Sequence, residues 1–275
     1  MTEAFYLPTD DPHRFIGTEH CPAPWSPKLS HGGPPSGLLV REIEALPSSV
    51  TGPTQIIRMT VDILGPVPVG EVAVSARVAR PGRSVELVEA ELAADGRTAI
   101  LVRVWRIRVA DLTLPVPSGV VPAPERFPGF PPRPLEIPPV PAESPTYRLP
   151  MWNTGYAAAM DWRWVAGGEE GGTPAAVWGR PRIDLVAGET ASPLARLMLL
   201  ADTANGLSRV LDVETWWFIN TELTVHLHRQ PAGEWFLLAS RSIVESHGAG
   251  MTEAELYDAD GRVGRLAQAL MVGPR

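Results

Sequence analysis

Two polar residues stand in segments that are otherwise apolar. Asp202 is the only acid in the stretch 192–207, and Gln268 lies between Leu266 and Leu270 near the C-terminus. Hydrolysis by water requires a group that accepts a proton from the water and polar groups that hold it in place. A carboxylate and an amide can supply these functions where they meet. The simpler interpretations stay open: Asp202 as a solvated surface acid, and Gln268 as a partner in a cross-strand amide hydrogen bond.

A second motif joins a histidine to glycines and a proline, in the order His31-Gly32-Gly33-Pro34. Glycines at the start of a helix expose backbone N–H groups, which can bind a carbonyl oxygen or a phosphate. The alternative is a tight turn that requires glycine for its backbone conformation. Both interpretations fit the motif, and His31 is either a ligand contact or a packed side chain.

Two other candidate sites lack residues that a metal site or a catalytic nucleophile would require. His226 and His228 are two apart on a predicted strand and so share a face, but no third ligand is evident nearby. Ser36 lies in Pro-Pro-Ser-Gly rather than in a nucleophile elbow. We therefore expect neither a metal nor another cofactor.

Composition and charge exclude several classes of protein. The chain has 275 residues, a formal charge of −7 and a single cysteine, Cys21. The acidic charge argues against a general nucleic-acid binder, and one cysteine cannot form an internal disulfide. The first fifteen residues lack the pattern of a secretory signal, and no run of 18 apolar residues occurs. These features predict a cytoplasmic protein without a membrane span.

Proline is concentrated in one segment. Thirteen of the thirty prolines fall between Pro115 and Pro150. Because proline has a fixed φ and no N–H, this segment cannot be a helix or a central strand. We interpret 113–150 as a connector between domains at 1–112 and 151–275, although such a segment could also bind a proline-recognising domain. The connector is expected to lie against a domain surface because it carries four large apolar residues: Phe127, Phe130, Leu135 and Ile137.

The same order of elements is predicted on both sides of this connector. Residues 37–46 form an amphipathic helix, and 54–110 alternate as antiparallel strands with a hairpin turn at Asp95-Gly96. In the second half, Ser192-Pro193 starts a helix whose apolar stripe runs to Leu207. The strands predicted to follow it are 216–228, 234–245, 250–257 and 264–272.

The two halves also share sequence at a constant offset of 163 to 165 residues. Thr60-Val61 matches Thr224-Val225, and Asp95-Gly96-Arg97 matches Asp260-Gly261-Arg262. The segments 89–92 and 253–256 both read Glu-Ala-Glu-Leu. Gly70-Glu71 likewise matches Gly233-Glu234. Four such matches in one order indicate an internal duplication. A helix packed on an antiparallel sheet, present twice in one chain, predicts an α+β double hotdog.

Three segments resemble one known family. They are Trp25…His31-Gly32-Gly33-Pro34-Pro35-Ser36-Gly37-Leu38-Leu39, the run from Phe218 to Arg229, and Gly264-Arg265-Leu266-Ala267-Gln268. Together they are similar to the double-hotdog acyl-CoA thioesterases related to bacterial thioesterase II. The resemblance covers nearly the whole chain outside the proline-rich segment. It implies an acyl-CoA substrate, and hotdog proteins often form oligomers, although no feature of this sequence sets the number of copies.

The resemblance also implies a catalytic trio. In that family an Asp on the second hotdog helix, a Thr on the following strand and a Gln on the last strand hold the hydrolytic water. These positions fall on Asp202, Asn220 and Gln268. Asn220 replaces the threonine and offers an amide instead of a hydroxyl. His31, Gly32, Gly33 and Thr221 are the expected substrate-binding residues.

The first half lacks the trio at matching positions. Gln268 maps onto Arg103, Asn220 near Ile56, and Asp202 near Leu38. The resulting hypothesis is a thioesterase with one site, in which water attacks the thioester directly and a glycine-flanked helix start polarises the carbonyl. The alternative is an acyl-binding hotdog protein without turnover. A hotdog hydratase ranks last, because no His-Asp pair occupies its usual loop.

Overall fold

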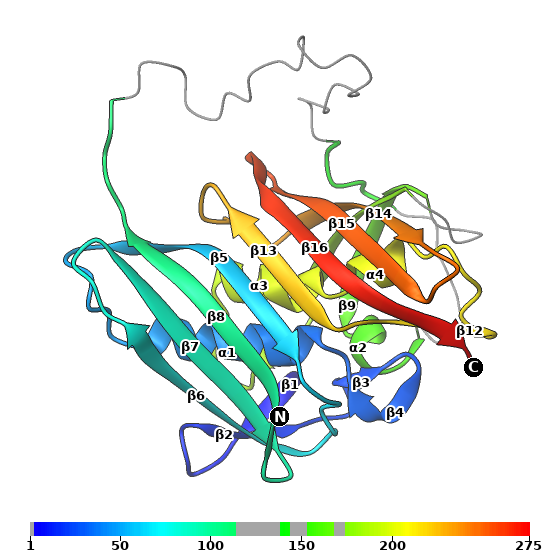
Figure 1. The fold of residues 1–275 in the computed structure, drawn as a ribbon, viewed down its shortest axis with the longest axis horizontal. Coiled ribbons are helices and arrows are strands. Elements are labelled where there is room, and N and C mark those ends of the chain that lie inside the picture. The colour runs from blue at the N-terminus through cyan, green and yellow to red at the C-terminus, as the bar shows by residue number, and fades with distance from the viewer. Residues whose placement is uncertain (1–2, 114–137, 144–152, 168–173) are drawn as a thin grey trace.

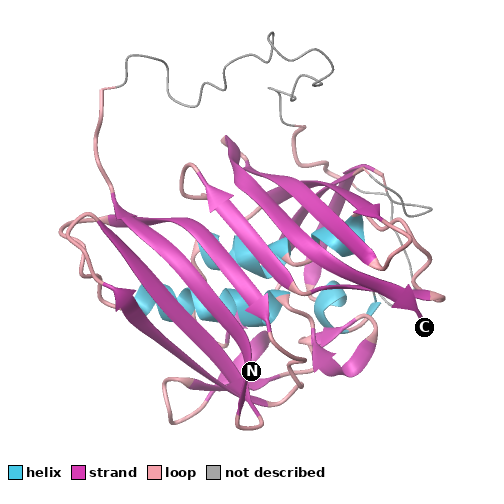
Figure 2. Ribbon diagram, in the orientation of Figure 1, coloured by secondary structure: helices cyan, strands magenta, loops and turns pink. Residues whose placement is uncertain are grey.

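A computed structural model of the chain describes residues 3–113, 138–143, 153–167 and 174–275. Most strands join one sheet in the order β11-β1-β2-β6-β7-β8-β5-β13-β16-β15-β14-β10-β9, and β12 pairs with β16. The helices lie together on one face of this sheet (Figures 1 and 2). The α+β class predicted from sequence is therefore confirmed.

The first half contains strands β1 (Ala4–Pro8), β2 (Arg14–Gly17), β3 (Pro22–Ala23) and β4 (Ser26–Ser30), followed by helix α1 (Gly33–Ala45). Helix α1 begins four residues before the predicted start at residue 37. Pro34 and Pro35 occupy its first turn, where a missing N–H costs no intrahelical hydrogen bond. The motif at His31 therefore leads directly into the helix.

Four long antiparallel strands cover α1, as the alternating pattern predicts. They are β5 (Thr54–Ile63), β6 (Glu71–Arg80), β7 (Val85–Ala94) and β8 (Arg97–Arg108). Asp95 and Gly96 connect β7 to β8 with φ angles of 50° and 72°. Positive φ at both positions is typical of a type I′ hairpin turn, which matches the twist of the two strands.

The second half begins with α2 (Gly155–Ala158), β9 (Met160–Ala166), β10 (Ala175–Pro181) and β11 (Asp184–Val186). The predicted helix then proves to be two helices, α3 (Pro193–Ala201) and α4 (Ala204–Leu207). The Ser192 side chain accepts the Ala195 N–H at 3.0 Å and caps α3 as expected. The prediction of one continuous helix was wrong, because the chain breaks at Asp202 and Thr203.

The last strands are β12 (Trp216–Asn220), β13 (Glu222–Leu227), β14 (Phe236–Val244), β15 (Ala249–Asp258) and β16 (Gly261–Pro274). The strand predicted over 216–228 is divided at Thr221. Its N–H donates to the carbonyl of Ala269, and its carbonyl accepts from Ile63. Thr221 therefore lies where the chain passes from β12, which pairs with β16, to β13, which lies between β16 and β5.

Pairing of β5 with β13 joins the two halves into one sheet, with Thr60 opposite Thr224. A second link was not predicted: β1 at the N-terminus runs parallel to β11 in the other half. Helices α1 and α3 pack against each other, and buried residues from both halves form one apolar core. The described residues include no helix long and apolar enough to cross a membrane.

Most of the proline-rich segment, including Phe127, Phe130, Leu135 and Ile137, lies outside the described residues. Within 138–143, the Pro138 carbonyl accepts a hydrogen bond from the Trp178 indole at 3.0 Å. Val140 packs against a buried cluster of Trp178, Leu237 and Tyr257. This short part of the segment therefore contacts the second half of the sheet.

A buried ion pair ties the end of α1 to the sheet. Arg106 on β8 donates to Glu86 on β7 at 2.5 Å, and Glu86 is fully buried. Arg106 also donates to the Ile43 and Leu46 carbonyls at the end of the helix, at 3.3 and 3.1 Å. Ser48 and Ser49 complete the shell of Glu86.

We predict that Glu86→Ala lowers the free energy of unfolding by about 3–5 kcal/mol, because Arg106 would keep a buried charge without its partner. Glu89→Ala is the control, since Glu89 pairs with the exposed residues Arg77 and Arg103. Its cost should stay within about 1 kcal/mol. Urea unfolding of the three proteins measures both values, and equal costs would contradict the prediction.

Candidate active site

Asp202 lies at the end of α3, where the helix breaks before α4. The residue is only 5% exposed. Its Oδ1 accepts a hydrogen bond from the side-chain amide of Asn220 at 2.8 Å. Asn220 is the last residue of β12, so the helix break and the strand end together hold the carboxylate. The structure thus brings together two of the residues selected from sequence.

Gln268 on β16 reaches the same helix break but bonds to its backbone. Its Nε2 donates to the Asp202 carbonyl at 3.2 Å, and its Oε1 accepts the Asn205 N–H at 3.1 Å. The amide therefore satisfies backbone groups that the interruption of the helix leaves without intrahelical partners. In this arrangement Gln268 fixes the place of Asp202, whereas sequence analysis expected it to hold water.

Gln268 continues into a row of buried polar side chains. Thr252 is its cross-strand partner on β15, and Ser242 on β14 pairs with Thr252. Hydroxyl hydrogen bonds of 2.6 and 2.7 Å link Thr252 to Ser242 and Ser242 to Ser208, just after α4. The row therefore connects the sheet to both sides of the helix break.

The matching row in the first half is apolar. Val104, Val88 and Val78 pair in the same order across β8, β7 and β6, at a constant offset of 164 residues. The strand register thus makes Val104, and not Arg103, the residue of the first half that is equivalent to Gln268. Because valines fill these positions in one half, the fold alone does not require polar residues there.

His31 is buried beside Asp202. Its Nδ1 accepts the Gly33 N–H at 3.0 Å and lies 3.4 Å from Asp202 Oδ2. An Nδ1 that accepts a hydrogen bond carries no proton, so the proton of the neutral ring is on Nε2. Burial lowers the pKa of His31, and the charge of Asp202 opposes this only in part. The contact with Asp202 is therefore not an ion pair at neutral pH.

Tyr156 on α2 completes the surroundings of His31, and sequence analysis missed it. The two rings stack with centroids 3.9 Å apart and an interplanar angle of 1°. The Tyr156 hydroxyl donates to the Leu199 carbonyl at 2.9 Å and lies 2.8 Å from the Thr203 hydroxyl. Burial raises the pKa of Tyr156, so this group stays protonated. No spacing rule connects residue 156 to 31, and no local signal could have found it.

Both glycines of the motif permit close contact with the end of α3. A Cβ added at Gly32 would lie 2.6 Å from Asp202 Oδ2, and one at Gly33 would lie 2.1 Å from the Leu199 carbonyl oxygen. A side chain at either position would therefore displace the helix end. This result supports a packing requirement for glycine and places Gly32 directly against the carboxylate.

The helix start offers fewer free N–H groups than expected. Gly33 donates to His31, Ser36 donates to the Gly32 carbonyl, and Pro34 and Pro35 have no N–H. Within the described chain, the Gly32 N–H has no acceptor. The donor that remains thus belongs to the glycine whose Cβ position would lie against the Asp202 carboxylate.

Thr221, also expected to bind substrate, is not gathered with these residues. Its side chain is exposed, and its hydroxyl donates to the Ala269 carbonyl at 3.4 Å. Among the residues that the structure describes, no group of three or more His, Cys, Asp or Glu side chains could hold a metal.

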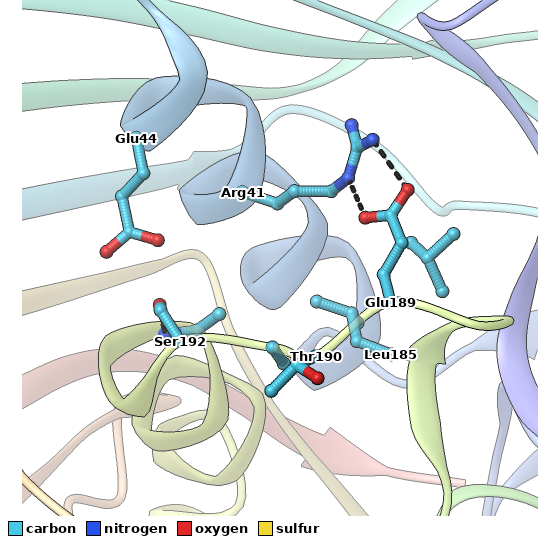
Figure 3. Close-up of a pocket in the computed structure, with 9 residues that line it drawn as sticks. Arg41, Glu44, Leu185, Glu189, Thr190 and Ser192 are labelled. Carbon is cyan, nitrogen blue, oxygen red and sulfur yellow. Dashed lines mark hydrogen bonds and ion pairs between the residues drawn. The ribbon is translucent and has the colours of Figure 1, made fainter.

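A separate cavity of about 130 Å³ opens at the other end of the α1–α3 pair. Figure 3 shows Arg41 paired with Glu189, and Glu44 facing the side of Ser192. The Arg41–Glu189 distances are 2.6 and 2.8 Å. This cavity contains neither Asp202 nor the glycine motif.

The architecture defines a class of protein: an α+β chain in which a helix pair lies against one antiparallel sheet, with a buried carboxylate where the helices meet. Family profiles agree with this class. The acyl-CoA thioesterase N-terminal domain matches residues 21–107, and the acyl-CoA thioesterase C-terminal domain matches residues 134–272. The chain therefore belongs to the acyl-CoA thioesterase family.

Solved structures show the same fold. A conserved protein with a hot dog fold from Alicyclobacillus acidocaldarius is 17% identical, with a TM-score of 0.68 over 96% of this chain and 95% of the other. Acyl-CoA thioesterase II TesB2 from Mycobacterium marinum is 15% identical, with a TM-score of 0.64 over 98% and 94%. The tesB protein from Mycobacterium avium subs paratuberculosis is 14% identical, with a TM-score of 0.61 over 97% and 95%. No curated protein matches the chain in sequence.

We predict that Gly32→Ala destabilises the protein by about 1–3 kcal/mol, because the new Cβ must displace the Asp202 carboxylate. The backbone itself is not strained, since Gly32 has a φ of −70°. Gly206→Ala in α4 is the matched control, as its Cβ would meet nothing within 4 Å. That variant should be neutral or up to about 1 kcal/mol more stable. Urea unfolding checks both, and a tolerated Gly32→Ala would contradict the geometry.

A second prediction concerns pH. The pKa of His31 is lowered from 6.5 by burial, so below that pH the unfolded chain takes up a proton that the folded chain does not. The free energy of unfolding should therefore fall as the pH drops from about 7.5 to about 5. In His31→Gln the fall should be smaller, while His226 and His228 contribute equally to both proteins. Identical pH profiles of urea unfolding would contradict a buried, neutral His31.

Proposed function

We propose that this protein hydrolyses an acyl-CoA thioester to a carboxylic acid and CoA by direct attack of water. The observation that carries the proposal is the Asp202 carboxylate, held by Asn220 at 2.8 Å and facing the glycine-rich start of α1. Membership of the acyl-CoA thioesterase family supports the substrate class.

Asp202 acts as the general base in this proposal. Oδ1 is held by Asn220, whereas Oδ2 faces Gly32 and the unprotonated Nδ1 of His31. Oδ2 is therefore the oxygen that accepts a proton from the attacking water. The water oxygen bonds to the thioester carbon, the C–S bond breaks, and the CoA sulfur takes the proton from Asp202. No covalent intermediate with the protein is formed.

The developing charge on the carbonyl oxygen needs a hydrogen-bond donor. The Gly32 N–H, which has no acceptor within the described chain, is the donor that we assign to it. His31 supports this role by holding the adjacent Gly33 N–H and by packing against Tyr156. Gln268 acts through the backbone of Asp202 and is a positioning residue.

Asn220 can replace the threonine that the family resemblance implies. Its Nδ2 donates to Asp202, and its amide oxygen remains an acceptor for the second hydrogen of the water. In a hydroxyl group one oxygen both donates and accepts hydrogen bonds. In the amide the nitrogen donates and the oxygen accepts, so the two functions lie on different atoms. The substitution therefore preserves hydrogen bonding to the carboxylate.

The domain organisation is part of the same proposal. We infer a double hotdog with domains at 1–112 and 151–275 joined by the connector 113–150, and a cytoplasmic location. Thr60 opposite Thr224 supports a two-fold relation between the halves, since these residues are 164 apart, as are the paired valine and polar rows. Only the end of the helix pair that holds Asp202 is expected to catalyse.

A second candidate function is acyl-CoA binding without turnover. Burial favours it: Asp202 is 5% exposed and His31 is 3% exposed, so substrate entry requires movement of their surroundings. A binding protein would retain acyl-CoA intact, whereas the proposed enzyme releases a free thiol that can be measured directly.

We predict that Asp202→Asn lowers kcat for acyl-CoA hydrolysis by about 100-fold or more, because the water loses its base. Asn220→Ala should lower kcat as well, because the Asp202 carboxylate loses the hydrogen bond that holds it in place. Asp212→Asn is the control, since Asp212 is an acid in the loop after α4 with only local hydrogen bonds. Thiol release across acyl chain lengths measures all four proteins. Full activity in Asp202→Asn would overturn the mechanism, and intact acyl-CoA with the wild type would favour the binding protein.

A further inference from the structure

Three basic side chains form a row across the seam between the two halves of the sheet. His226 on β13 pairs with Arg58 on β5 on one side and with Arg265 on β16 on the other. Direct cross-strand partners point to the same face, with Cβ atoms about 5 Å apart. Val225 and Leu227 point into the core, so His226 and its partners lie on the opposite face, away from α1 and α3 (Figure 1).

This row differs from the other arginines on the outer face of the sheet. Arg77 and Arg103 share Glu89, Arg241 pairs with Glu253, and Arg262 pairs with Glu255. Within the described chain, the side chains of Arg58 and Arg265 have neither an ion pair nor a hydrogen bond. The Nε of Arg58 is also buried without an acceptor. An orphaned donor on a charged group is costly, and an anionic ligand would supply its partner.

The surroundings of the row do not neutralise it. Glu255, opposite Arg265 on β15, forms an ion pair with Arg262. Trp105, opposite Arg58 on β8, carries the guanidinium of Arg80 over its ring at 5.9 Å. The flanking outward residues are Thr224 on β13 and His228 just after it. Burial, Arg265 and Arg58 lower the pKa of His226, which is consistent with crowded positive charge.

The internal repeat sharpens the contrast. Equivalent positions of the two halves are 164 residues apart. The position equivalent to Arg58 is Glu222, and the position equivalent to His226 is Asp62. Glu222 and Asp62 are themselves cross-strand partners, at the other end of the same seam. One end of the seam is therefore acidic and the other basic, although the two ends are equivalent positions of a duplicated fold. Sheet pairing alone does not require the basic end.

We propose that Arg58, His226 and Arg265 form a binding site for a phosphate group carried by a small ligand. Two guanidinium groups beside an imidazole match the charge and the several acceptor oxygens of phosphate. In a protein with a net charge of −7, such a site must act through these local groups. Two sources share this chemistry: the phosphates of CoA itself, and a separate phosphate-bearing metabolite.

Pyrophosphate is the probe for the site, with binding to the full-length protein measured by calorimetry. We expect Arg58→Gln and Arg265→Gln each to weaken binding by at least tenfold, because each removes a charge that contacts the anion. Arg241→Gln is the matched control, since Arg241 lies on the outer face of the same sheet but is paired with Glu253. Its affinity for pyrophosphate should equal that of the wild type. No binding by the wild type, or equal loss in all three variants, would overturn the proposal.

A second measurement does not depend on the folding of any variant. In the wild-type protein, pyrophosphate should raise the pKa of His226, followed by imidazole NMR, and leave the exposed His247 unchanged. Equal shifts at both histidines, or a shift at neither, would contradict the site.

Calorimetry with CoA and with pantetheine separates the two sources. If CoA occupies the site, Arg58→Gln weakens binding of CoA but not of pantetheine. If CoA binding is unchanged while pyrophosphate binding is lost, the ligand is a separate phosphate-bearing molecule. Neither arm uses hydrolysis, so the proposed function and this site fail independently.

Discussion

The close approach of α1 and α3 is the constraint on which the candidate site depends. A Cβ at Gly33 would lie 2.1 Å from the Leu199 carbonyl oxygen, and one at Gly37 would lie 3.2 Å from that of Ala195. These two glycines are one helical turn apart, and they let the antiparallel helices meet backbone to backbone. The end of α3 therefore lies beside the start of α1, and Asp202 lies against Gly32. Side chains between the helices would separate the carboxylate from the Gly32 N–H, which has no acceptor among the described residues.

A row of polar side chains at three sheet positions distinguishes the second half from the first. Gln268, Thr252 and Ser242 occupy positions that valines fill in the other copy of the repeat. Burying an amide and hydroxyls is unfavourable unless each finds a hydrogen-bond partner. Gln268 finds its partners in the interrupted backbone at Asp202 and Asn205, and the hydroxyls bond to one another. The helix break and the polar row therefore depend on each other, which explains why only one half has both.

Local patterns in the sequence predict the elements well and their long-range contacts poorly. Alternation and turn residues locate the hairpins, and Ser192-Pro193 locates the start of α3. The apolar stripe from Leu194 to Leu207, however, passes Asp202 without interruption, so periodicity predicts one helix. The partner that secures the break is Gln268, 66 residues further along the chain. Tyr156 likewise reaches His31 through folding alone. The identity of Asp202, Asn220 and Gln268 as neighbours came from family resemblance, and the role of each came from the hydrogen bonds.

Charge in this protein acts over short distances. At physiological ionic strength, interactions between exposed charges are screened beyond about 8 Å, so the net charge of −7 does not prevent an anion from binding to a local cationic group. Glutamates on neighbouring strands neutralise most outward arginines, and these pairs add little attraction for a ligand. The same screening means that a cation matters most where its side chain has no ion-pair partner, as at Arg58 and Arg265 within the described chain, where Glu255 beside Arg265 pairs with Arg262 instead. An anionic ligand is therefore attracted by such arginines locally, and their position on the sheet is more informative than the total charge.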